Sequence, residues 1–145
     1  YDLIVLSDVI EHIYNPWKIL KNIKKILTKK GIVLLSIPNL QNIKYINAII
    51  SGNFFYEKTG LFDETHIRFF TMNTIIKYLK NLNFKIVSTD WREDKTLKNI
   101  KEILLKELQN KEYVYLKLEN INLKIFKKNV DNYLSQQILI CISDA

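Results

Sequence analysis

Two predominantly apolar runs, separated by an amphipathic helix pattern, constrain the fold of this chain more than any other feature. The runs are residues 3–6 and residues 32–37. Short continuous apolar runs are typical of strands buried on both faces of a parallel sheet. Between them, Asn15 and Pro16 resemble a helix N-cap and the first helical residue. Strand, helix and strand with short links predict a right-handed parallel crossover, and therefore an α/β fold.

The rest of the chain alternates helix and strand patterns around one long irregular segment. Residues 52–70 have no clear period and are rich in aromatic rings, which is typical of a functional loop. Gly31 suits a left-handed residue after the first helix, Thr71 suits a helix cap, and Asn83 suits a left-handed turn. Residues 113–126 are compatible with either strand or helix. The remaining patterns predict helices over 41–50, 71–82 and 97–108, and strands over 84–88 and 137–142.

Size and composition point to one globular domain over residues 1–145. No apolar run reaches the length of a membrane span, and the single cysteine, Cys141, fits a reducing cytoplasm. The three glycines are too scattered to form a nucleotide-binding glycine loop. Because Tyr1 already lies in an apolar run, we expect a further segment upstream of it.

The net charge of +7 allows two interpretations. A basic surface can attract nucleic acid or anionic membranes. Scattered lysines, however, usually form a solvated face, and the chain has only two arginines, Arg68 and Arg92. We therefore expect neither a nucleic-acid nor a membrane partner, and keep a basic nucleic-acid-binding protein as a second alternative function.

Candidate site residues follow the first predicted strand. Asp8, Glu11 and His12 would share one face of a helical turn, and the only other histidine is His66. Such carboxylates and imidazoles can hold a divalent metal or orient a general base. The alternative is structural, with His12 bracing its turn and His66 hydrogen-bonding a loop.

These segments resemble class I S-adenosylmethionine-dependent methyltransferases. The resemblance rests on the D-V-I-E-H segment ending at His12, on Pro38-Asn39 after the second strand, and on the D-E-T-H-I-R-F-F segment around His66. It implies a partial Rossmann-like sheet, strands 4 to 7 of the family fold, with residues 137–142 as the antiparallel seventh strand. One subgroup with these motifs includes bacterial enzymes that modify cell-surface glycans or small metabolites.

The resemblance also implies roles for individual residues. Ser7, Asp8 and Val9 would bind the methionine end of S-adenosylmethionine, and Glu11, His12 and His66 would be catalytic, in O-methylation of a small-molecule or glycan hydroxyl. The family's glycine-rich cofactor loop would precede Tyr1. We therefore expect this fragment to be inactive or weak.

A metal is implied by one related group, the small-RNA terminal 2′-O-methyltransferases, which hold magnesium or a similar ion with an E-x-x-E-H motif and a later histidine. Asp8, Glu11, His12 and His66 match these positions, with aspartate in place of the first glutamate. The RNA substrate does not carry over, because the later motif differs.

An alternative function is a non-catalytic, truncated methyltransferase-like interaction module. If the first strand lacks a neighbour, residues 2–7 form an open apolar edge, which predicts a homo-oligomer through that strand.

Overall fold

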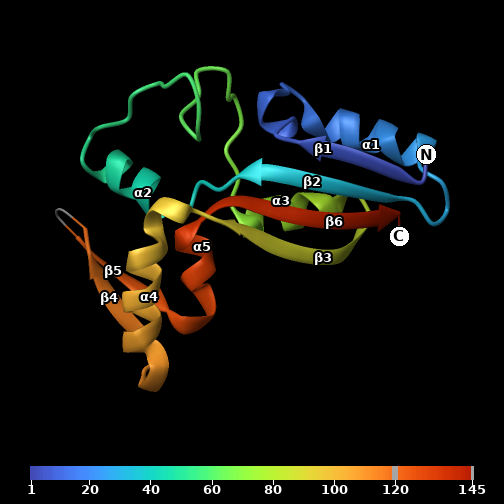
Figure 1. Ribbon diagram of the computed structural model, residues 1–145. Coiled ribbons are helices and arrows are strands. Elements are labelled where there is room, and N and C mark those ends of the chain that lie inside the picture. The colour runs from blue at the N-terminus through green and yellow to red at the C-terminus, as the bar shows by residue number, and fades with distance from the viewer. Residues whose placement is uncertain (119–120, 145) are drawn as a thin grey trace.

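The predicted strand–helix–strand crossover is present in the computed structural model, which describes residues 1–118 and 121–144. Strand β1 (Leu3–Ser7) pairs in parallel with β2 (Ile32–Pro38). Helix α1 (Pro16–Ile26) connects them and lies beside β1 in Figure 1. The Asn15 side chain accepts a hydrogen bond from the Lys18 amide at 3.1 Å, which confirms the predicted cap.

The sheet has the order β1-β2-β6-β3, and its last two strands are longer than predicted. Strand β6 (Ser135–Asp144) runs antiparallel between β2 and β3 (Phe84–Glu93). The carboxyl ends of β1, β2 and β3 therefore meet the first residues of β6 at one end of the sheet. The partial methyltransferase sheet inferred from the sequence is thus confirmed, including its antiparallel strand.

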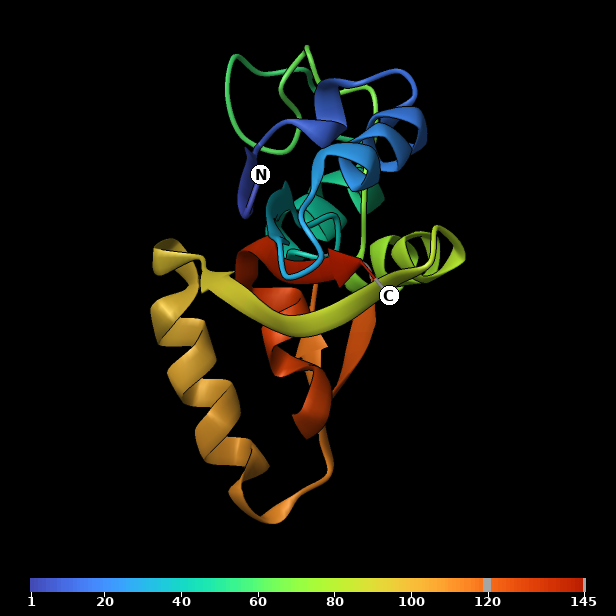
Figure 2. The ribbon, with the colours of Figure 1, turned by 90° about the vertical axis from the view of Figure 1, so that its right-hand side faces the viewer.

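Helices cover only one face of this sheet. Helix α3 (Met72–Asn81), capped by the Thr71 hydroxyl, packs with α1 against the buried side of β2 and β6 (Figure 2). On the opposite face, Leu3 and Val5 are 51% and 58% exposed. Strands β1 and β2 are therefore not buried on both faces, contrary to the prediction from their apolar runs.

A second, smaller unit projects from the same end of the sheet (Figures 1 and 2). It contains α4 (Lys98–Glu107), the hairpin of β4 (Tyr113–Lys117) with β5 (Asn122–Phe126), and α5 (Val130–Leu134). Helix α2 (Ile43–Ile50) contributes Ile43 to its separate apolar cluster. The segment 113–126 is thus a hairpin, with residues 119 and 120 outside the described part, and α5 was not predicted. Single turns of 3-10 helix are η1 (Ile10–His12), η2 (Lys95–Leu97), η3 (Leu108–Asn110) and η4 (Lys127–Asn129).

The structure confirms one of two predicted left-handed turn residues and contradicts the other. Asn83 adopts a φ of 59°, as the predicted left-handed turn requires. The prediction for Gly31 was wrong, because α1 ends at Ile26 and Gly31 is not among the residues with positive φ. Gly31 is instead required by space: a Cβ there would lie 2.7 Å from Leu27 Cγ and 2.8 Å from the Tyr1 carbonyl.

No helix within residues 1–118 and 121–144 is both long enough and apolar enough to cross a membrane.

Candidate functional site

The predicted site residues leave the sheet where β1 ends. Asp8 has a φ of 52°, and its amide donates to the Ser36 carbonyl at 3.0 Å. Ile10 is fully buried in the core and anchors the short turn η1. This anchor holds the next two residues, Glu11 and His12, at the carboxyl end of the parallel strands, where ligands of open α/β sheets bind.

Glu11 is buried without a partner for its carboxylate. It is 1% exposed, and neither carboxylate oxygen has a hydrogen-bond partner among residues 1–118 and 121–144. Its backbone carbonyl accepts from the amides of Ile67 and Arg68, both at 3.0 Å, which joins η1 to the long loop. Burial raises the pKa of the Glu11 carboxyl, and the nearby charge of Asp8 adds to this. Burial of a carboxylate without a hydrogen-bond partner is costly, so this residue is a candidate functional group.

The neighbours of His12 fix which of its two ring nitrogens carries the proton when the ring is neutral. Its Nδ1 lies 3.2 Å from the Thr65 carbonyl and 3.0 Å from the Thr65 hydroxyl oxygen. That hydroxyl donates its proton to Asp63 Oδ1 at 2.5 Å, so both Thr65 groups can only accept from the ring. Nδ1 therefore carries the proton, and the lone pair of a neutral His12 lies on Nε2.

His66 has the same tautomer for a similar reason. Its ring is 9% exposed, and its Nδ1 lies 2.9 Å from the Leu61 carbonyl, which can only accept. The His66 lone pair is therefore also on Nε2. The two rings meet edge to face, with centroids 4.6 Å apart. Backbone and hydroxyl groups that fix the tautomer in this way are typical of the surroundings of metal-binding histidines.

Three of the four residues predicted to bind metal converge. Within residues 1–118 and 121–144, candidate ligand atoms of Glu11, His12 and His66 all lie within 4.8 Å of one another. Asp8 is not among these three residues, and its carboxylate accepts a hydrogen bond from Gln137. Two imidazoles and one carboxylate suit a borderline divalent cation, whereas magnesium prefers oxygen ligands.

A cavity of about 260 Å³ opens beside these residues. It is lined by the end of β1, the loop around His66, α2 and the first residues of β6. Tyr45, Gln136 and Gln137 line it and were not singled out from the sequence. The lining residues are Asp8, His12, Pro38, Tyr45, Thr59, Gly60, Leu61, Asp63, His66, Gln136 and Gln137.

The three predicted cofactor residues do not share this cavity. Asp8 lines it, whereas Ser7 lines a separate hollow of about 270 Å³ on the bare face of the sheet. Val9 lines neither, and its carbonyl accepts from the His12 amide at 3.2 Å. Of the three, Asp8 is therefore the one whose side chain can reach a ligand in this cavity.

Comparisons with known proteins give one consistent result. A family model described as a methyltransferase domain matches residues 1–89. A solved S-adenosylmethionine-dependent methyltransferase from Archaeoglobus fulgidus matches 97% of the chain at 14% identity and a TM-score of 0.56. Another from Thermotoga maritima matches 99% at 15% identity, with the same TM-score. The chain spans only 58% and 56% of these two proteins. The search of curated proteins gave no match.

Proposed function

Because the chain belongs to the methyltransferase domain family and carries part of the class I S-adenosylmethionine-dependent methyltransferase fold, we propose that it serves transfer of a methyl group from S-adenosylmethionine to a hydroxyl. The observation that carries this proposal is the convergence of candidate ligand atoms of Glu11, His12 and His66 within 4.8 Å of one another, beside the cavity. Nitrogen lone pairs at this position can accept the proton that a hydroxyl loses as its oxygen is methylated.

The cofactor would meet this chain at the end of β1. The Asp8 carboxylate faces the cavity and suits the ammonium group of the methionine moiety, and Ser7 and Val9 flank it. The 145 residues hold three scattered glycines and no glycine-rich loop. We therefore propose that this chain alone binds S-adenosylmethionine weakly and transfers methyl groups slowly.

A divalent cation fits the three converging residues. Glu11 would supply a carboxylate oxygen, and His12 and His66 would supply their Nε2 atoms. The fit rests on the Glu11 oxygens, which are buried and have no partner among the described residues. Such a cation, when bound, lowers the pKa of a hydroxyl and orients it. Because two donors are nitrogens, we propose zinc in place of the magnesium expected from the sequence.

The residues of this chain would contribute to methyl transfer mainly by positioning the acceptor hydroxyl. Methyl transfer is an in-line displacement that depends on alignment of the acceptor oxygen with the methyl group. The Nδ1 protons of His12 and His66 are fixed by Thr65 and Leu61, so both Nε2 atoms keep one orientation. When no cation occupies these lone pairs, either Nε2 can hold the hydroxyl proton without a change of rotamer.

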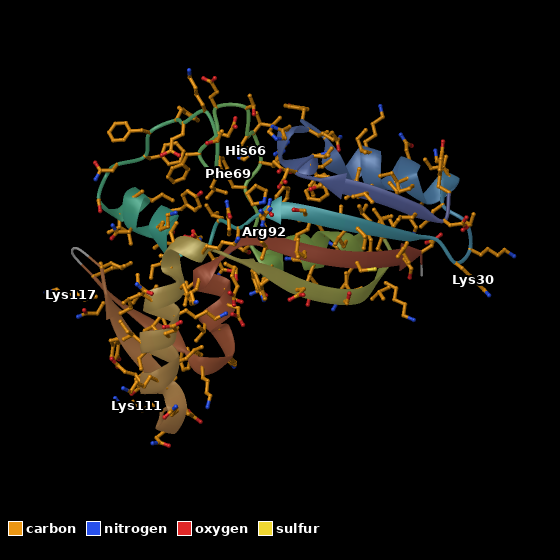
Figure 3. All side chains as sticks on the ribbon, viewed as in Figure 1. Lys30, His66, Phe69, Arg92, Lys111 and Lys117 are labelled. Carbon is orange, nitrogen blue, oxygen red and sulfur yellow. The ribbon has the colours of Figure 1, made fainter. Side chains whose placement is uncertain are left out.

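The acceptor is best matched by an uncharged small molecule or glycan. Asp8 and Asp63 line the cavity, and no lysine or arginine among the residues that the structure describes does so. Hydrogen bonds from the Thr65 side chain and amide lower the pKa of Asp63, so its charge persists at neutral pH. In Figure 3 the labelled Lys30, Lys111 and Lys117 lie away from His66. This arrangement disfavours phosphate groups, and with them a nucleic-acid partner.

Binding and transfer can be tested separately. Calorimetry with S-adenosylmethionine should detect weak binding to the purified chain, and incubation with labelled cofactor and neutral glycans should label a hydroxyl slowly. Glu11→Gln removes the carboxylate that would hold the cation and should reduce labelling by roughly 100-fold, the upper range for loss of a residue that supports a metal site. Glu64→Gln changes an exposed residue of the same loop and should leave labelling unchanged. Absence of cofactor binding would favour the non-catalytic interaction module instead.

A further inference from the structure

Three polar side chains from separate strand ends form one hydrogen-bonded chain. Arg92 at the end of β3 donates from Nη1 to Gln137 Oε1 at 2.9 Å. Gln137, near the start of β6, donates from Nε2 to Asp8 Oδ1 at 2.5 Å. Arg92 is labelled in Figure 3 at the same end of the sheet as His66. The hydrogen-bonded chain therefore links three strands at the end of the sheet where the candidate site lies.

The direction of this hydrogen-bonded chain is fixed by chemistry. A guanidinium only donates and a carboxylate only accepts, so the amide of Gln137 must present its oxygen to Arg92 and its nitrogen to Asp8. A flipped amide would oppose two donors at one end and two acceptors at the other. Because Gln137 is 8% exposed, water cannot easily replace either bond.

Asp8 needs such a support. Its φ of 52° is uncommon for any residue other than glycine, and surrounding contacts must hold it there. Oδ1 accepts from Gln137, while Oδ2 accepts only a long hydrogen bond of 3.4 Å from the Ser7 hydroxyl within the described residues. The carboxylate thus keeps one oxygen available to a donor in the cavity that Asp8 and Gln137 both line.

We propose that Gln137, backed by Arg92, is a positioning residue that holds the Asp8 carboxylate toward the cavity, where it receives the ammonium group of S-adenosylmethionine. The inference rests on the proposed function for the identity of that ligand. The hydrogen-bonded chain itself rests only on the geometry of the three side chains. The two parts can therefore fail independently.

A polarity swap separates positioning from structural support. Gln137→Glu places a carboxylate against Asp8, while Asp8→Asn/Gln137→Glu restores a donor–acceptor pair with the charge moved onto β6. For the full 145-residue chain, we expect the unfolding midpoint to fall by roughly 4 °C in Gln137→Glu and to recover in the double variant. Affinity for S-adenosylmethionine, measured by calorimetry, should fall about tenfold in both, because the carboxylate is misplaced in both.

Each outcome has a defined meaning. Gln109→Glu adds the same charge at an exposed residue of the projecting unit and should change neither quantity. A double variant with no recovery of the midpoint would overturn the hydrogen-bonded chain. Recovery of both midpoint and affinity would overturn the positioning role. A wild-type chain that binds no S-adenosylmethionine would overturn that role together with the proposed function, while the midpoints would still decide whether the hydrogen-bonded chain exists.

Discussion

The imidazole rings of His12 and His66 lie edge to face with centroids 4.6 Å apart, although one follows β1 and the other belongs to the long loop before α3. The contact depends on loop docking, because the carbonyl of Glu11 accepts from the amides of Ile67 and Arg68. Arg68 also donates from its side chain to the Tyr14 carbonyl. The candidate site therefore forms only when this loop is seated against η1.

Thr65 should control the affinity of the site for a cation. Its carbonyl and hydroxyl hold His12 Nδ1, and its hydroxyl donates to Asp63. Thr65→Val removes the hydroxyl at nearly constant volume and should weaken zinc binding by about tenfold, as expected for a lost support of a histidine ligand. Thr65→Ser keeps the hydroxyl and should bind zinc as the wild type does. Equal affinities of Val and Ser variants in calorimetric titrations would contradict this assignment.

Asp94 should make stability depend on acid pH. Burial acts to raise the pKa of its carboxyl, but hydrogen bonds from Thr96, Asn42 and Lys44 outweigh burial and lower it. A lowered folded-state pKa contributes stability above the unfolded value of about 3.9, and this contribution is lost as pH falls through the folded value.

We expect Asp94→Asn to lose about 1–2 kcal/mol of unfolding free energy at pH 7, with a smaller difference from wild type at pH 3. Urea denaturation at both pH values measures this difference. Asp90→Asn changes an exposed aspartate four residues away and should show little effect. A deficit in Asp94→Asn that is as large at pH 3 as at pH 7 would argue against the charge-dependent account.

Adding a side chain at Gly31 should lower the stability of the fold. A Cβ at Gly31 would clash with the Leu27 side chain and the Tyr1 carbonyl, so Gly31→Ala should cost about 1–3 kcal/mol by crowding. Gly52 has a φ of +72° but open space around it. Gly52→Ala should therefore cost only about 1 kcal/mol of backbone strain. The midpoint of thermal unfolding should be higher for Gly52→Ala than for Gly31→Ala. The reverse order would show that the turn before β2 relaxes readily.

The two edge strands of the sheet differ in how well they are protected against pairing with another strand. Strand β3 carries charged residues such as Lys85 and Asp90 and has register shifts against β6, whereas β1 has no charged residue from Leu3 to Ser7. We propose that β1 pairs with the same strand of a second copy, as expected from the sequence. Val5→Lys should shift the chain to monomer in light scattering, and Thr89→Lys on β3 should not. A wild-type chain that stays monomeric at high concentration would refute the pairing.

The sheet was predictable because its signals are local. Apolar runs and the caps at Asn15 and Thr71 identify strands and helices within short windows. Residues 113–126 were ambiguous because the hairpin is stabilised by burial of Val114 and Ile125 against α4 and α5, which no local pattern reveals. Gly31 was misjudged because its requirement comes from Leu27 and Tyr1 and not from its own φ.

The site was only partly predictable for a related reason. Glu11, His12 and His66 stand out as residue types in motifs, but Asp8 could not be separated from them by spacing. Its partner Gln137 comes from the far end of the chain and reaches Asp8 because β6 is inserted antiparallel beside β2. The tautomers of both histidines likewise depend on carbonyls and hydroxyls placed by the folded loop.

The central claim is that Glu11, His12 and His66 form one cation site of mixed nitrogen and oxygen donors. Titration of the chain with cobalt(II), followed by visible absorption, tests it most directly, because the spectrum reports the ligand set. We expect saturation at one equivalent, loss of the signal in His66→Ala and Glu11→Gln, and retention of the signal in Asp8→Asn. An unchanged spectrum in the wild type, or a signal that survives His66→Ala, would contradict it.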